Sequence, residues 1–267
     1  MTEEDRPPIP QGIKRTVRQE CFFGCVLCGA PVFHYDHIEE YSVVKEHTTD
    51  NLALLCERHH GAKTTGKLSK ERVKEGRLAP FNRDRVVSAG WQQEGSRLIN
   101  IELGGNSSAC TLSQANPVHH VLWNTGSTFL ALHWTDGWYS ISAVLTDENG
   151  QPLLVIDRGE LKVFSQQVWD YQYEGTTLKV RGGFGVILLN IRWSDTEFVV
   201  ERGCFMNPQG DGFTVGNGLM TVIQRRVVGM SVGSSCAENS FGSWGLNNSA
   251  FYPTDQCPGG FGFFQGV

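Results

Sequence analysis

Two short pairs of metal-binding side chains share the same spacing near the start of the chain. Cys25 and Cys28 form a Cys-x-x-Cys pair, and Cys56 and His59 form a Cys-x-x-His pair that begins 28 residues after Cys28. Two thiol-rich pairs of this kind suit tetrahedral Zn²⁺. We predict a structural zinc site that clamps the base of a ββα unit whose hairpin lies between the pairs. A cluster of buried thiols without metal is the alternative.

Side chains suited to acid–base and metal chemistry lie within and just after this gap. Asp36 and His37 are adjacent, Asn51 follows them, and His60 comes directly after the second pair. Five of the eight histidines fall between residues 34 and 60, a concentration that an ordinary core does not require. Taken singly, these residues also fit a turn, a structural histidine and a helix cap. Their order beside the zinc ligands favours a catalytic site.

The segments CVLCGAPV, YDHI, DNLALLC and RHHGAKT resemble the HNH endonucleases, the ββα-metal nuclease superfamily, over about residues 15–75. His37, Asn51 and His60 take the three positions that name the family. The resemblance implies that Asp36 and His60 bind a catalytic divalent ion, usually Mg²⁺. It also implies that His37 deprotonates the attacking water, while Asn51 holds the loop and orients that histidine.

Three details of this site are open at the level of sequence. Most family members have Cys where this chain has His59, so His60 competes for the zinc, although the equal spacing of the pairs favours His59. Cys21 is a substitute zinc ligand or, as we expect, a packed thiol. Adjacent residues on a strand point to opposite faces, so a twisted or bulged hairpin end must bring Asp36 and His37 to one phosphate.

The basic side chains are concentrated in one segment. Residues 63–85 carry eight Lys/Arg and three Asp/Glu, a net charge of +5, whereas residues 91–267 carry nine and fifteen, a net charge of −6. Neutralising phosphates supplies affinity for nucleic acid without sequence preference. A solvated helix face is the alternative. We predict nucleic-acid contacts, with DNA as the expected partner, from Lys63, Lys67, Lys70 and Arg72. The remaining histidines of the region, His34 and His47, are expected to face substrate or solvent.

The elements that must position these residues change character along the chain. Residues 1–12 are polar and proline-rich and are expected to be flexible, with a basic helix from Ile13 to Glu20 and a later helix starting at Ser69. The HNH domain is expected over residues 13–88.

Beyond Gly90, runs rich in β-branched and aromatic residues predict an all-β domain over residues 89–228. A hairpin turn is expected at Asp147–Gly150. Residues 229–267 are rich in Gly, Ser and Asn and are expected to form a flexible or partly ordered tail. The predicted fold class is therefore α+β, a small zinc-stapled domain followed by a sandwich- or barrel-like domain.

Composition bounds the setting. The chain of 267 residues has no basic start with an apolar run, and no long apolar stretch, so we expect a cytoplasmic protein without membrane insertion. Eight cysteines would allow a disulfide framework, but the clustering of four within residues 21–56 favours metal binding.

The leading functional hypothesis is a metal-dependent DNA endonuclease of bacterial defence or mobile DNA. Its β domain would target or regulate cleavage by binding a ligand, a protein or a second copy, and a homodimer would supply the two active sites of a double-strand break. The first alternative is a non-catalytic zinc-knuckle module that binds nucleic acid. The second is an interaction protein built on the β domain with a zinc-stapled appendage.

Overall fold

The computed structural model describes residues 7–84, 93–94, 97–163, 168–232, 236–238, 242–247 and 261–264. Its contacts divide the chain into two units, Met1–Ala89 and Gly90–Val267, which we call the N-terminal unit and the β unit. The division lies one residue from the boundary expected at 88/89. Residues 229–267, expected as a separate tail, belong to the β unit.

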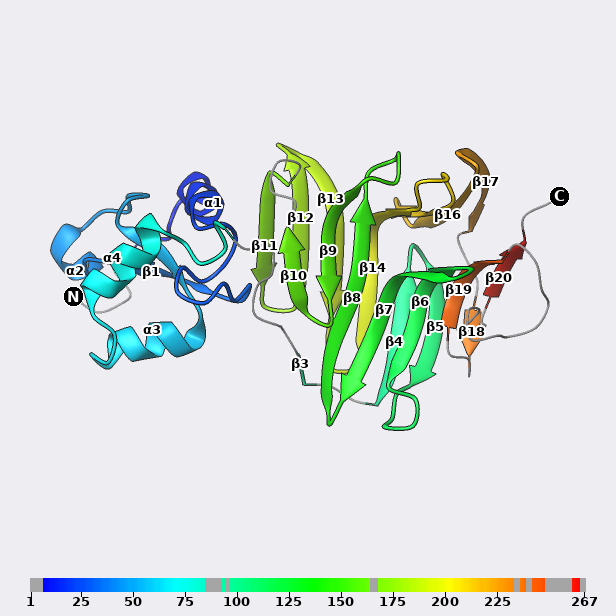
Figure 1. Cartoon of the computed structure of the whole chain (residues 1–267), viewed down its shortest axis with the longest axis horizontal. Helices are drawn as coiled ribbons and strands as arrows, with labels where there is room; N and C mark the ends of the chain where they lie inside the picture. Colours follow the sequence, from blue (N-terminus) through cyan, green and yellow to red (C-terminus); the bar gives the residue numbers. More distant parts are fainter. Residues whose placement is uncertain are drawn as a thin grey trace. The chain divides into compact units, whose positions relative to one another are not determined.

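The N-terminal unit contains four helices and one antiparallel hairpin (Figure 1). Its elements in chain order are α1 (Gln11–Glu20), β1 (His34–His37), α2 (Tyr41–Val44), β2 (Leu52–Leu55), α3 (Glu57–Thr64) and α4 (Lys70–Leu78). Helix α1 begins two residues before the predicted start. The Ser69 side chain caps α4 by accepting a hydrogen bond from the Arg72 backbone N–H at 3.2 Å, so the predicted helix start is confirmed.

The core of the N-terminal unit is centred on β2. All four residues of this strand are fully buried, because α1 and α3 both contact it. The apolar cluster around it comprises Val17, Cys21, Cys25, Val26, Ile38, Leu52, Ala53, Leu54, Leu55 and Val73. Strand β1, the partner of β2, carries the polar sequence HYDH, so the hairpin presents chemical groups on a strand that the core holds in place.

The β unit consists of two predominantly antiparallel sheets. The first has the strand order β10-β9-β8-β7-β6-β19-β20, with β3 paired to β8, and the second has the order β11-β12-β13-β14-β15-β16-β17, with β4, β5 and β18 attached through β14. The strands are β3 (Gln93–Glu94), β4 (Leu98–Leu103), β5 (Asn106–Thr111), β6 (Val118–Asn124), β7 (Ser127–Thr135), β8 (Trp138–Thr146), β9 (Pro152–Asp157), β10 (Glu160–Val163), β11 (Asp170–Glu174), β12 (Thr177–Gly183), β13 (Val186–Trp193), β14 (Glu197–Met206), β15 (Gly212–Gly216), β16 (Leu219–Gln224), β17 (Val227–Val232), β18 (Cys236–Glu238), β19 (Gly242–Asn247) and β20 (Phe261–Phe264).

Side chains from the two sheets meet in a shared interior, as in a sandwich (Figure 1). The Phe129 and Phe213 rings pack edge to face at 6.4 Å, and the buried Ser243 hydroxyl donates to Ser108 of the other sheet at 2.7 Å. Strand β4 shows the reason for this packing, because its residues alternate strictly between exposed and buried. The alternation directs one face of the sheet inward.

The predicted turn and the predicted tail have different outcomes. Asp147 accepts hydrogen bonds from the backbone N–H groups of Asn149 and Gln151, both at 2.8 Å, and Gly150 has φ 77°, which confirms the hairpin turn between β8 and β9. In the segment expected as a flexible or partly ordered tail, the described residues form strands, and β19 inserts between β6 and β20. The Gly- and Ser-rich composition concealed short strands that the rest of the sheet stabilises.

No helix among the described residues has both the length and the apolar character needed to cross a membrane.

Candidate metal centre and active site

The four predicted zinc ligands converge on one point. His59 Nδ1 lies 3.3 Å from the sulfur atoms of both Cys25 and Cys56, and the Cys28 and Cys56 sulfurs lie 3.7 Å apart. All four ligand atoms lie within 4.8 Å of one another. Two thiolates bound to one tetrahedral Zn²⁺ at about 2.3 Å are about 3.8 Å apart, so the cluster matches the edge lengths that zinc requires. The cluster therefore fits structural zinc.

Local geometry explains why these ligands meet. The backbone N–H groups of Cys28 and Gly29 both donate to the Cys25 carbonyl, at 3.3 and 2.7 Å, and Gly29 has φ 75°. A Cβ at Gly29 would lie 2.2 Å from the Asn82 side chain, so this tight turn requires glycine.

The thiols of the cluster influence one another. A hydrogen bond from Cys25 lowers the pKa of Cys28, while the same bond together with burial raises the pKa of Cys25 to about 12. Cys21, the substitute ligand considered above, lies in the apolar core instead, and burial raises its pKa to about 11. Cys21 is a packed thiol, as expected.

Helix α3 separates the two adjacent histidines. The helix begins directly after Cys56, so His59 and His60 lie in its first turn, about 100° apart around its axis. His59 faces the thiols, whereas His60 Nε2 lies 3.5 Å from Asp36 Oδ1. The geometry therefore groups His59 with the zinc ligands and His60 with Asp36.

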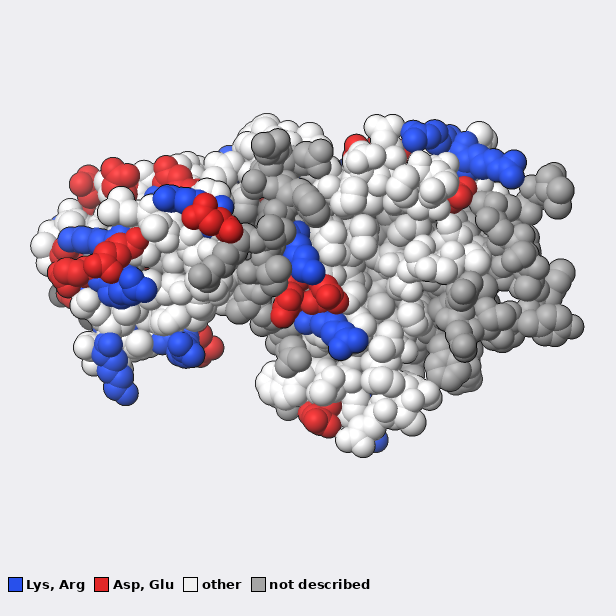
Figure 2. All heavy atoms as spheres, in the orientation of Figure 1, with Lys and Arg blue, Asp and Glu red and all other residues white. Residues whose placement is uncertain are grey.

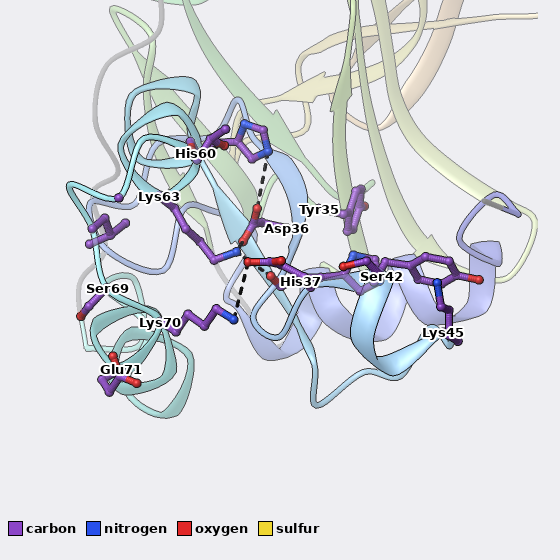
Figure 3. A pocket seen from close by; sticks show the side chains of 15 residues that line it. Tyr35, Asp36, His37, Ser42, Lys45, His60, Lys63, Ser69, Lys70 and Glu71 are labelled. Atoms are coloured by element: carbon purple, nitrogen blue, oxygen red, sulfur yellow. Dashed lines mark hydrogen bonds and ion pairs between the residues drawn. The ribbon is translucent and has the colours of Figure 1, made fainter. Parts of the chain in front are cut away.

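Asp36 lies at a junction of charged groups on β1. Its carboxylate is 8% exposed and forms an ion pair with Lys63 Nζ at 2.8 Å. The same ammonium donates to the His37 carbonyl at 2.6 Å. Figure 3 shows Asp36, His60 and Lys63 pointing toward one another. Lys63, predicted to contact phosphate, thus provides the positive charge beside this carboxylate.

The predicted twist or bulge between Asp36 and His37 is absent. The β1–β2 register runs without interruption from His34 opposite Leu55 to His37 opposite Leu52. The neighbouring side chains diverge, and the His37 ring contacts the loop that follows β1. Both residues nevertheless line one pocket of about 920 Å³, because β1 ends at His37 and the pocket extends around that end (Figure 3).

Asn51 holds the backbone that follows β1. Its side-chain amide donates to the Glu39 carbonyl at 2.9 Å and accepts from the Glu39 N–H at 2.8 Å, and its own carbonyl accepts from Ile38 N–H at 2.8 Å. These bonds place Asn51 beside the loop that the family resemblance assigns to it. Its effect on His37 passes through the backbone.

The basic segment is largely neutralised by acids from other elements, which sequence spacing did not indicate. The ion pairs are Lys63–Asp36, Lys70–Glu39, Lys70–Glu40, Arg72–Glu75, Lys74–Glu39 and Arg77–Glu20. Hydrogen bonds from Lys74 and Lys70 lower the pKa of Glu39. The whole chain has charge −5 and residues 91–267 have −6, so residues 1–90 carry only +1. Figure 2 shows the two signs interspersed. The predicted polyanion surface is reduced to scattered cations such as the exposed Lys67.

Sequence reasoning missed the residues that contact the His37 ring. His47 Nδ1 lies 3.1 Å from His37 Nε2, and His47 Nε2 lies 2.8 Å from the Pro7 carbonyl. The Tyr41 ring stacks on His47 at 4.8 Å. His47 was expected to face substrate or solvent, and the N-terminal segment was expected to be flexible, but Pro7 is bonded to the site. The clustering of histidines was a signal, although nothing in their spacing paired His37 with His47.

The candidate binding residues of the β unit divide between its core and its surface. Trp134 and His119 are buried, whereas Phe184, in the turn between β12 and β13, is 88% exposed. Arg225 and Arg226 form the turn between β16 and β17, and both have positive φ. Among the described residues, the only grouping of three or more potential metal ligands is the zinc cluster of the N-terminal unit.

Comparison with protein-family models gives one match, the HNH endonuclease family over residues 25–66. The matched range begins at the first zinc ligand, includes the β1–β2 hairpin and ends two residues after α3. Comparisons with curated proteins and with solved structures give no match. Residues 25–66 of the N-terminal unit therefore form an HNH endonuclease domain.

Proposed function

We propose that the chain is a metal-dependent endonuclease that hydrolyses phosphodiester bonds in DNA. The observation that carries the proposal is the meeting of Asp36 and His60 in a pocket that His37 also lines. A carboxylate and an imidazole 3.5 Å apart form a donor set for one divalent ion and leave further positions for water and phosphate. The nearby Lys63 ammonium supports this assignment, because it shows that the Asp36 carboxylate accommodates positive charge.

The remaining side chains have complementary roles. Asp36 and His60 would hold Mg²⁺ or another divalent ion, which supplies a Lewis acid for the charge that develops on the phosphate and the leaving oxygen. His37 takes a proton from water as the water oxygen forms a bond to phosphorus. The bond from phosphorus to the leaving sugar oxygen breaks, and solvent protonates that oxygen. Asn51 holds the loop that ends this strand.

The test is cleavage of supercoiled plasmid by the full chain with Mg²⁺ or Mn²⁺, with single-stranded DNA and RNA as parallel substrates. We expect open-circular product only when the divalent ion is added. Asp36→Asn should cut more than about a hundredfold more slowly with unchanged zinc content, since it loses a charged ligand. Plasmid binding without cleavage of any substrate by the wild-type protein would favour the non-catalytic zinc-knuckle module instead.

For the β unit we propose a targeting or regulatory role. The support is its net charge of −6 over residues 91–267, which makes it a poor surface for a nucleic acid, together with the exposed Phe184 at a hairpin tip. The Phe184→Ser variant should leave the rate on a short oligonucleotide unchanged while altering binding of the targeted partner. Loss of cleavage on the oligonucleotide would contradict this separation of roles.

A further inference from the structure

A chain of hydrogen bonds connects the N-terminal segment to the proposed general base. The Pro7 carbonyl lies 2.8 Å from His47 Nε2, and His47 Nδ1 lies 3.1 Å from His37 Nε2. Tyr41 packs against both rings, stacked on His47 and edge-on to His37 at 5.5 Å. Three separate parts of the unit therefore meet around one imidazole.

The direction of the hydrogen bonds follows from the chemistry of the first group. A backbone carbonyl only accepts, so His47 Nε2 must carry a hydrogen. A neutral imidazole has one N–H, so His47 Nδ1 then carries the lone pair and accepts a hydrogen bond from His37 Nε2. This fixes the His37 hydrogen on Nε2 and leaves the basic lone pair of His37 on Nδ1.

We propose that His47, itself held by the Pro7 carbonyl, is a positioning residue that fixes the tautomer and the ring orientation of His37. This inference rests on the proposed function, because it concerns His37 as the general base. Asn51 bonds to the backbone after β1, whereas His47 bonds to the ring. The His37 side chain is 5% exposed, so protein groups rather than bulk water determine which nitrogen carries the hydrogen.

The expected contribution is large because a general base in the wrong tautomer has no lone pair where the water must bind. In a catalytic triad, the wrong tautomer of the histidine lowers turnover by about ten-thousandfold. A partial loss of orientation costs less, about 10–100-fold for groups that support another residue.

Two substitutions at one position separate orientation from packing. His47→Phe keeps a ring against Tyr41 and removes the acceptor, and it should lower single-turnover cleavage about 10–100-fold with little change in KM. His47→Asn places an amide oxygen near the position of Nδ1 and should restore most of the rate. Deletion of residues 1–8, which removes the Pro7 carbonyl and retains Ile9, should give a smaller loss. Equal losses in His47→Phe and His47→Asn would overturn the proposal.

The decisive readout does not require cleavage. The full zinc-loaded chain, labelled with ¹⁵N-histidine, is observed by NMR at a pH of about 8, above the usual imidazole pKa of about 6.5, with His37→Ala used to assign the signals. We expect His37 in the Nε2–H tautomer in the wild type and a mixture of tautomers in His47→Phe. An Nδ1–H tautomer of His37 in the wild type, or an unchanged His37 spectrum in His47→Phe, would overturn the inference. If no substrate is cut, the proposed function fails separately, whatever the spectrum shows.

Discussion

The N-terminal unit buries one short strand and the apolar residues around it, whereas the β unit buries side chains from strands of both its sheets. Cys25 belongs to that small core and is also a metal ligand. A small core contributes little net stability, and small domains commonly add a structural metal. The comparison teaches that the catalytic hairpin rests on a scaffold that depends on zinc, while the β unit depends on sheet packing. Each of the following predictions breaks or sharpens this difference.

Zinc removal should have the largest effect. A strong chelator, or Cys56→Ser, should abolish the thermal transition of the N-terminal unit and leave that of the β unit in place, because structural zinc contributes about 10–16 kcal/mol of apparent binding energy in small domains. Calorimetry together with zinc analysis measures both. Cys21→Ser is the matched control, since Cys21 is buried outside the cluster. Loss of zinc from Cys21→Ser and retention by Cys56→Ser would show that the ligand set is wrong.

Loss of the Asn51 side chain should have the next largest effect. Asn51→Ala removes two hydrogen bonds to Glu39 and leaves those backbone groups partly unsatisfied, so the N-terminal unit should lose about 1–3 kcal/mol in free energy of unfolding. Cleavage should also fall because the end of β1 is less constrained. Chemical denaturation measures the first effect and should show no change in the β unit. A stability equal to wild type would remove Asn51 from the account of the loop.

Lys63→Met should change metal affinity more than stability. The substitution removes the ammonium 2.8 Å from Asp36, so a divalent ion no longer meets a positive charge beside its carboxylate. Mn²⁺ should then bind about three- to tenfold more tightly, as measured by electron paramagnetic resonance in the absence of nucleic acid. Lys67→Met, an exposed lysine of the same segment, is the control. An equal change in both variants would contradict a specific role for Lys63.

Acidification should have the smallest effect and should act on the β unit. Burial lowers the pKa of His120 and of His133, so the unfolded chain binds protons more readily than the folded one. The β unit should therefore lose stability as the pH falls below about 6.5, the usual imidazole pKa, and should gain nothing from these groups at higher pH. Calorimetry between about pH 7.5 and 5.5 tests the sign. The His133→Asn variant should show a weaker loss, and a transition that rises on acidification would contradict the argument.

The sequence predicted the groups that short spacing determines and missed those that tertiary packing determines. The zinc pairs and the meeting of Asp36 with His60 followed from ligand spacing and family resemblance. The bonding of His37 to His47 and Pro7 depends on how separate loops fold back, which no local pattern records. The charge of residues 63–85 was misleading for the same reason, because Glu39 and Glu20 come from other elements. The strands beyond residue 229 escaped notice because neighbouring strands, rather than their own composition, stabilise them.

The most direct test of the central claim compares wild type with His37→Ala in single-turnover cleavage of supercoiled plasmid, with zinc content and the N-terminal thermal transition measured on the same samples. The account predicts nicking by the wild type with Mg²⁺ or Mn²⁺ and a rate lower by about 10²–10⁴-fold in His37→Ala, with zinc content and thermal transition unchanged. Equal rates in the two proteins would contradict His37 as the general base.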